Sequence, residues 1–174
     1  MQPSARSQDR KGEMTPLEQE ASRLEESAKF AAQSQFEAAK SWRAWHWVLG
    51  GLATGASGIG GVLTFASGDL QMLGGGLAIA AALSAAVLTT LRPGTQADAA
   101  QSVANEYLAI QGDARRLRLL GLPDMDPSAS YESVKALAEQ SKRINAQAAP
   151  PPRFAYQRAK TNIENGGQTH EVDA

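Results

Sequence analysis

The residues of this chain that could do chemistry match a dehydrogenase pattern. Residues 54–61 read Thr-Gly-Ala-Ser-Gly-Ile-Gly-Gly, which fits the Thr-Gly-x-x-Gly-x-x-Gly pattern of some short-chain dehydrogenases. Such glycines let backbone N–H groups approach the pyrophosphate of a dinucleotide. Two Tyr-x-x-x-Lys pairs of the same pattern are also present, Tyr131 with Lys135 and Tyr156 with Lys160. The chemistry would be hydride transfer with a nicotinamide cofactor.

The setting of the glycine motif argues against that chemistry. A dinucleotide loop follows a β-strand and lies about 20 residues before a ribose-binding acid, whereas residues 54–61 lie inside a long uncharged run. The chain has no cysteine, so it has no thiolate nucleophile. His46 has no metal-ligand companions, and no paired carboxylates, Ser-His-Asp set or Walker loop occurs. We therefore expect no enzyme activity, catalytic residue, cofactor or metal.

The chain is organised around residues 44–91, which contain one formal charge, Asp69. Uncharged runs lie on both sides of it, at residues 44–68 and 70–91. At about 1.5 Å per helical residue, each run can cross a hydrocarbon core of about 30 Å. A short turn at Gly68 and Asp69 would make the two runs antiparallel neighbours. The sequence thus predicts a transmembrane helical hairpin that interacts with a lipid bilayer.

Aromatic and basic residues flank the hairpin. All three tryptophans, Trp42, Trp45 and Trp47, lie at the entrance to the first run beside Arg43, and Arg92 follows the second run. Indole rings favour the headgroup level of a bilayer, so we predict that these five residues lie at the membrane interface. The alternative is a buried aromatic cluster in a soluble bundle. Because the turn carries only an acidic charge, the positive-inside rule places both arms and both termini in the cytoplasm.

Small residues form the predicted packing faces of the two runs. Gly51 and Gly55 make a Gly-x-x-x-Gly pair, and further small residues recur at spacings of four. The packing or pore candidates are Gly51, Gly55, Ser57, Gly61, Gly76, Ala80 and Ser84. Small residues let helix backbones approach closely in lipid. Two interpretations stay open, homo-oligomerisation around a pore and tight packing within one hairpin.

The first arm has a strong helix start. Thr15, Pro16 and Glu18 supply the elements of a capping box with proline at the first helical position. Apolar residues then recur at alternating spacings of four and three from Leu17 to Leu49, and only Gln35 breaks this seam. No proline or glycine interrupts the stretch, so one long helix continues into the first uncharged run.

The second arm has matching signals. Pro93 and Gly94 break the helix after the second run, and a seam at residues 100–117 mirrors the first arm. Asp126 and Pro127 start another helix. The predicted fold is all-α, a two-transmembrane hairpin extended by a cytoplasmic antiparallel helical stalk and a short C-terminal helical segment. The expected segments are a disordered lead (1–14), a cytoplasmic helix (15–43), two spans (44–68 and 69–91), a cytoplasmic helix (92–121), a C-terminal helix (122–148), and a proline-rich spacer and tail (149–174) with a short helix at 154–165.

This order of features resembles the SLATT family, the SMODS and SLOG associating two-transmembrane effectors, over residues 17–173. The motifs that carry the resemblance are residues 38–43, Leu91-Arg92-Pro93, residues 104–108 with Arg115 and Arg116, and residues 155–160. The resemblance implies an effector of a bacterial conflict system in the inner membrane. Such an effector is held inactive until a nucleotide-signal synthase or sensor partner responds to infection, and it then perforates the membrane.

The sequence leaves three functional hypotheses. The leading one is an oligomeric, pore-forming or membrane-perturbing effector in an antiviral defence system. The second is a membrane-anchored scaffold that recruits a soluble partner, and the third is a soluble helical bundle. A net charge of -1 argues against a nucleic-acid partner, because phosphate neutralisation needs clustered excess basic charge.

Overall fold

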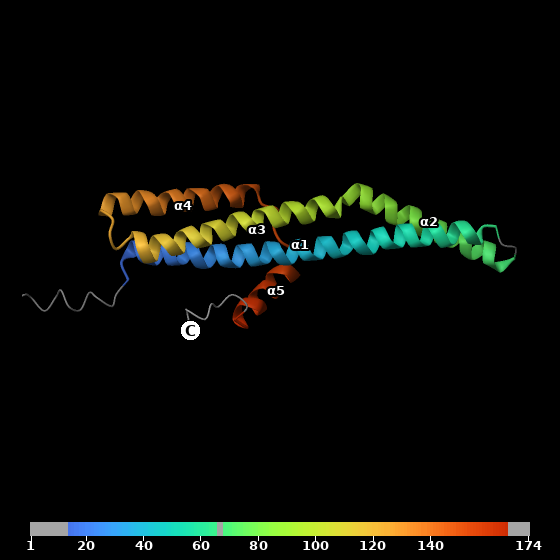
Figure 1. Ribbon diagram of the computed structural model, residues 1–174, viewed down its shortest axis with the longest axis horizontal. Coiled ribbons are helices and arrows are strands. Elements are labelled where there is room, and N and C mark those ends of the chain that lie inside the picture. The colour runs from blue at the N-terminus through green and yellow to red at the C-terminus, as the bar shows by residue number, and fades with distance from the viewer. Residues whose placement is uncertain (1–13, 66–67, 167–174) are drawn as a thin grey trace, which may run out of the picture.

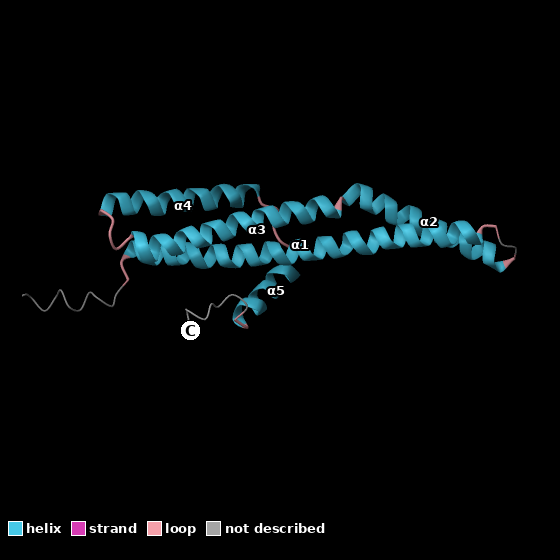
Figure 2. Ribbon diagram, viewed as in Figure 1, coloured by secondary structure: helices cyan, strands magenta, loops and turns pink. Residues whose placement is uncertain are grey.

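The computed structural model describes residues 14–65 and 68–166. The predicted disorder of residues 1–13 and of the tail after residue 166 lies outside the described residues. The elements are α1 (Pro16–Leu63), α2 (Asp69–Leu91), α3 (Pro93–Arg116), the π-helix η3 (Leu117–Gly121), α4 (Pro127–Gln147) and α5 (Arg153–Glu164). No strand occurs among these residues (Figure 2). The all-α class is therefore confirmed for the part of the chain that the structure describes.

Helix α1 is the longest helix of the described chain, and the other helices pack on it. It runs along almost the whole length of the described chain, with α2 and α3 laid end to end beside it (Figure 1). The predicted capping box starts it, since the Thr15 side chain accepts from the Glu18 N–H at 3.3 Å and Glu18 Oε2 accepts from the Thr15 N–H at 2.6 Å. Two of the orphan N–H groups at the helix start are thereby satisfied.

The end of α1 differs from the expected boundary at residue 68. The helix ends at Leu63, with Thr64 as the C-cap. The Thr64 hydroxyl donates to the carbonyl oxygen of Gly61 at 2.6 Å. Such a local side-chain bond gives a backbone carbonyl a partner other than the helix ladder. The first predicted span is therefore shorter as a helix than the uncharged run that suggested it.

The break between α2 and α3 is confirmed at the predicted position. Arg92 has left-handed dihedral angles, φ 45° and ψ 55°, and α3 begins at Pro93. Proline has no N–H for the helix ladder and disfavours a helical conformation at the preceding residue. Figure 1 shows the direction of the chain changing at this point. Helix α3 continues along α1. The break therefore changes the direction of the chain, but α1 stays paired, first with α2 and then with α3.

The second arm ends in a π-helix, whose turns are wider than those of the expected α-helix. Residues 117–121 form a π-helix, in which the Leu122 N–H donates to the Leu117 carbonyl at 2.8 Å. Within it, Arg118 reaches across to α1, and its Nε and Nη2 donate to Glu25 Oε2 at 3.1 and 2.9 Å. The two side chains are 26% and 18% exposed, so this partly buried pair fixes the end of the second arm to the start of α1.

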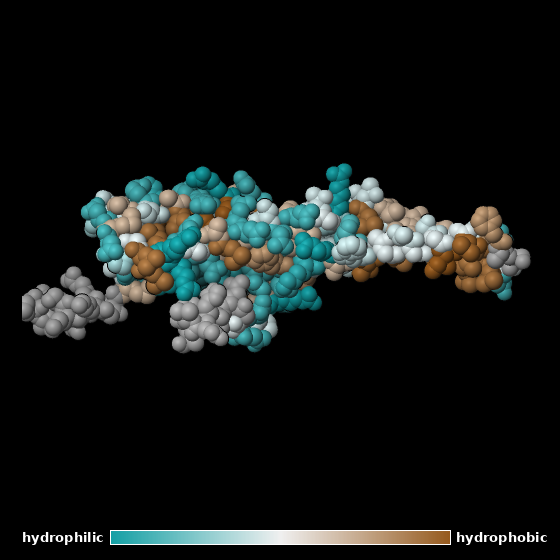
Figure 3. Space-filling view, viewed as in Figure 1, coloured by the Kyte–Doolittle hydropathy of each residue, from teal (hydrophilic) through white to brown (hydrophobic). Residues whose placement is uncertain are grey.

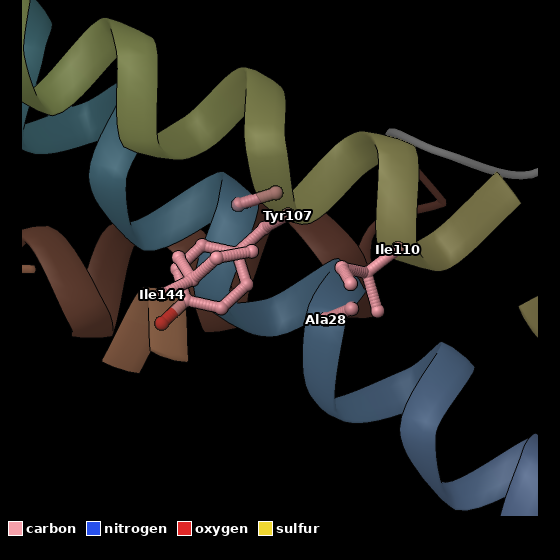
Figure 4. Close-up of a cluster of buried hydrophobic side chains, with 5 residues drawn as sticks. Ala28, Tyr107, Ile110 and Ile144 are labelled. Atoms are coloured by element: carbon pink, nitrogen blue, oxygen red, sulfur yellow. The ribbon is translucent and has the colours of Figure 1, made fainter. Parts of the chain in front are cut away.

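Helix α4 folds back along α3 and completes a helical bundle with α1. Its start is confirmed, because Asp126 is the N-cap, Pro127 is the first helical residue, and Asp126 Oδ2 accepts from the Ser128 N–H at 3.2 Å. The bundle core gathers residues from all three helices (Figure 4), namely Ala28, Ala32, Tyr107, Ile110 and Ile144. Tyr107 Oη donates to Asn145 Oδ1 at 2.5 Å, so the one hydroxyl in this core has a partner.

Helix α5 leaves the bundle at an angle and packs on α1 (Figure 1). Ala155 and Ala159, four residues apart on one face, are completely buried. Side chains this small allow the two helix backbones to come close together. The proline-rich spacer before α5 thus connects α4 on one side of the bundle to a docking place on α1.

Candidate membrane interface and helix-packing site

The apolar end of the molecule is formed by α2 and the last third of α1. In Figure 3 the tip of this end is hydrophobic and the helix pair behind it is mostly neutral to hydrophobic, whereas the bundle of α1, α3 and α4 mixes hydrophilic with hydrophobic surface. Within the described residues, one helical stretch is long and apolar enough to cross a membrane, Asp69–Gly121, with a mean hydropathy of 1.9 over its most apolar window. The end of α1 is less apolar, because glycines fill much of it. The sequence predicts two membrane spans, whereas one helical stretch of the described residues meets the criteria of length and apolar composition.

The apolar surface of these helices faces outward. Only 17% of the most apolar window of Asp69–Gly121 is buried, whereas the core helix of a soluble protein is mostly buried. The large hydrophobic side chains that are exposed at this end lie on α1, in the turn directly after it, or on α2. They are Trp45, Trp47, Val48, Leu52, Ile59, Val62, Phe65, Leu70, Met72, Leu73, Ile79, Leu83, Val87 and Leu91. A contiguous exposed apolar surface of this extent marks a site of interaction with membrane or protein.

Two glycines bring α1 and α2 into close contact. A Cβ placed on Gly60 would lie 3.0 Å from the Gly74 carbonyl oxygen and 3.2 Å from Leu77 Cβ. A Cβ placed on Gly74 would lie 3.0 Å from the Gly60 carbonyl oxygen and 3.0 Å from Leu63 Cβ. The two helix backbones come into direct contact here, and a Cβ at either position would crowd the facing helix.

The buried positions around this contact are all small. They are Ala56, Gly60, Gly74, Ala81 and Ser84. Ser84 is satisfied within its own helix, since its Oγ donates to the Ala80 carbonyl at 2.8 Å. Sequence reasoning missed Gly60 and Gly74. Continuing the alternating four and three spacing of the first arm past Leu49 gives Leu52, Ala56, Ile59 and Leu63, so the seam includes Ala56 and passes one residue away from Gly60.

Most of the predicted packing candidates face away from this contact. Gly51, Gly55, Gly61 and Gly76 have no atom within 4 Å of a Cβ built on them, and they are exposed. Ser57 is also exposed, Ala80 is half-buried, and Ser84 alone is buried between α1 and α2. The Gly-x-x-x-Gly pair therefore contributes nothing to packing within the hairpin.

A groove runs along one side of the helix pair. It has a volume of about 410 Å³ and is lined only by small residues, namely Ala53, Ser57, Gly60, Gly61, Thr64, Ala78, Ala81, Ala82 and Ala85. Small residues on both walls leave room for a further helix to approach either backbone. The predicted candidates Ser57 and Gly61 belong to this groove.

The predicted interface residues of the two arms lie at one level of the molecule. Trp42 and Trp45 on α1 line a groove of about 250 Å³ together with Leu91 and Pro93 from the α2–α3 break. At the same level, a Cβ on Gly94 would lie 3.4 Å from His46 Nδ1. The structure therefore brings the tryptophan cluster of one arm beside the proline break of the other.

Basic side chains surround that level. Arg43 Nη2 lies 3.9 Å from Asp98 Oδ1 in an exposed pair. Arg92 is exposed at the break itself, and Trp47 is 73% exposed. An exposed indole beside guanidinium groups suits a boundary between apolar and aqueous surroundings, because the ring is apolar and its N–H is polar.

The turn between α1 and α2 is built on a glycine. Gly68 has φ 75° and ψ −143°, a conformation that residues with a Cβ rarely adopt. Asp69 was expected in the turn and is the first residue of α2. Its carboxylate lies at the helix N-terminus, where the helix dipole favours negative charge.

The dehydrogenase-like residues do not form a site. The motif at residues 54–61 is helical throughout as part of α1, so its N–H groups serve the helix ladder. Tyr131 and Lys135 share one face of α4, while Tyr156 and Lys160 belong to α5, and each lysine pairs with a glutamate of its own helix. In the described ranges, no group of three or more metal-binding side chains occurs.

Comparison with known proteins adds no relative. No protein-family model, curated protein or solved structure matches the chain. The resemblance to the SLATT family stays a prediction.

Proposed function

We propose that the chain is a membrane protein in which α2 and the end of α1 cross the bilayer as an antiparallel pair, with the bundle of α1, α3, α4 and α5 as a cytoplasmic stalk. The observation that carries this proposal is the outward-facing apolar surface of the pair, which buries only small residues internally. In water such a surface would be costly, at about 25 cal/mol per Å² of apolar area. In a bilayer the same surface is solvated by lipid.

The proposed activity is perturbation of a bacterial inner membrane by an oligomer, as an effector of a conflict system of the SLATT type. Gly51 and Gly55 support the oligomer, because they lie on exposed α1 surface with no neighbour within 4 Å. A Gly-x-x-x-Gly pair that is not used within the hairpin is available to a helix of a second copy. The signal for activation would come from a nucleotide-signal synthase or sensor partner encoded nearby.

Leakage from vesicles tests the proposal. The purified protein is reconstituted into liposomes loaded with a self-quenched dye, and release is compared with that of Gly51→Leu and Gly55→Leu. Both variants should insert and fold, since each Leu enters open space, and both should leak far less. Val62→Leu is the control, because it enlarges a side chain that is already large and exposed. Absence of leakage by the wild-type protein, with insertion confirmed, would refute the proposal.

A second candidate function is a membrane-anchored scaffold. A groove of about 550 Å³ on the stalk supports it, lined in part by Arg23, Phe30 and Tyr156. Charged and aromatic side chains around an open groove suit a soluble protein partner. Under this alternative, Gly51→Leu and Gly55→Leu would leave the function intact as long as the protein inserts.

A further inference from the structure

The C-terminal segment crosses the two arms of the stalk. Helix α4 packs on both α3 and α1, whereas α5 packs on α1. The link between them, residues 148–152, passes beside α1 on its way from one to the other (Figure 1). The segment from Ala148 to Glu164 therefore connects α4, which packs on both arms, to the outer side of α1.

A buried amide pins the link in place. Gln35 is the one residue that breaks the apolar seam of the first arm, and it is only 5% exposed. Its Nε2 donates to the carbonyl oxygen of Ala149 at 2.9 Å. A buried polar side chain is costly unless it is hydrogen-bonded, so the sequence carries this glutamine for its distant partner.

The pinned link sits where the stalk meets the apolar helix pair. A groove of about 130 Å³ next to it is lined from three sides, by Gln35 and Trp42 of α1, Val103 of α3, and Ala149 and Pro150 of the link. Three consecutive prolines make the link stiff, because each fixes its own φ angle. A stiff link therefore joins α5 to the groove that Trp42 lines.

The attachment of the segment is small compared with the seam between the arms. It consists of the Gln35 hydrogen bond and the docking of α5 through Ala155 and Ala159. The arms also share the core of Ala28, Ala32, Tyr107 and Ile110, which does not need α5. Such an attachment can open without unfolding the bundle, in the way that weakly packed elements open locally.

We propose that residues 148–164 are a releasable strap that holds α1 and α3 in one axial register beneath Trp42, and that release of the strap lets the arms move. The strap itself does not depend on the membrane activity. Its role as a restraint on membrane permeability rests on the proposed function.

The test uses the full chain in detergent micelles and in vesicles. Gln35→Leu removes the pin and keeps a similar volume, and Ala159→Glu places a carboxylate in a fully buried position of α5. The controls make the same changes at exposed positions of α4, Gln140→Leu and Ala136→Glu. Because the chain has no cysteine, spin labels at the exposed positions Gln19→Cys on α1 and Ala109→Cys on α3 report the distance between the arms without a background.

Two physical measurements test whether residues 148–164 act as a strap. Amide hydrogen exchange over residues 153–164 should become about tenfold faster in Gln35→Leu, a change of about 1.4 kcal/mol, and faster still in Ala159→Glu. The distance distribution between the labels should broaden in both variants and in neither control. Unchanged exchange in both variants, or faster exchange with an unchanged distance distribution, would overturn the proposal.

Vesicle leakage then separates the strap from the proposed function. Faster leakage by the two released variants supports the restraint. Equal leakage by the wild-type and released proteins overturns the restraint. If the distribution broadens and no form leaks, the proposed membrane activity fails while the strap stands.

Discussion

Addition of one methyl group at Gly60 should weaken the packing of α1 on α2. In Gly60→Ala, the new Cβ would lie 3.0 Å from the Gly74 carbonyl oxygen, 3.2 Å from Leu77 Cβ and 3.3 Å from the Ala78 nitrogen. Each of these distances is shorter than an ordinary van der Waals contact of 3.4–4 Å, so the helices must separate by a few tenths of an ångström. Since two of the three neighbours are backbone atoms, no side-chain rotation can relieve the contact.

The matched variant Gly61→Ala sets the scale. It adds the same methyl to the same helix with nothing within 4 Å. Both variants gain the same helix propensity, about 1 kcal/mol in a helix interior, so their difference isolates the steric term. Overpacking of a close contact costs about 1–3 kcal/mol. We expect Gly60→Ala to be less stable than Gly61→Ala by that amount.

The assay is equilibrium unfolding of the full chain in mixed micelles, followed by circular dichroism. Gly74→Ala should behave like Gly60→Ala, because its Cβ would lie 3.0 Å from Leu63 C and from the Gly60 carbonyl oxygen. Equal unfolding free energies for Gly60→Ala and Gly61→Ala would show that the glycine contact does not hold the pair together, and the reasoning would be refuted.

Three further predictions concern the bundle of α1, α3 and α4. Arg118→Ala should lower the unfolding free energy by about 1.5–3 kcal/mol, because it leaves the partly buried Glu25 without its two charged donors. The control is Asp98→Ala, which removes an exposed ion pair and should change the unfolding free energy by less than about 0.5 kcal/mol. Similar losses of stability in both variants would contradict the prediction. Tyr107→Phe should cost about 1 kcal/mol through the lost bond to Asn145. Burial, helped by the charge of Glu106, raises the pKa of Tyr107 above 10.0, so the folded state holds the phenol proton more tightly than the unfolded state. Stability should therefore fall as pH rises above about 10, and a wild-type stability profile that matches Tyr107→Phe there would contradict this account.

Local signals predicted the ends of several helices. The capping box at Thr15, the break at Pro93 and the cap at Asp126 are all confirmed. Each depends on atoms within three or four residues along the chain, so the sequence contains all the information needed. The end of α1 was misplaced, because an uncharged run shows where a helix could continue and does not show where Thr64 ends it.

The packing face of the apolar helices could not be chosen from composition. Small residues occur all around the end of α1, and the Gly51–Gly55 spacing made one face more conspicuous than the face of Ala56 and Gly60. Which face is used depends on where α2 lies, and that position is set by the turn at Gly68 and by the seam of the stalk below. The conspicuous pair turned out to be exposed.

The sequence by itself determined the all-helical class, the uncharged segment and the places where helices begin and break, because these follow from propensity, charge and capping over short distances. The tertiary structure decided that Gly60 meets Gly74, that Gln35 bonds Ala149, and that Ala155 and Ala159 dock α5 on α1. These contacts join residues far apart in the chain. The same small or polar residue could serve at several positions, and only the packed arrangement of the helices selects one partner for it.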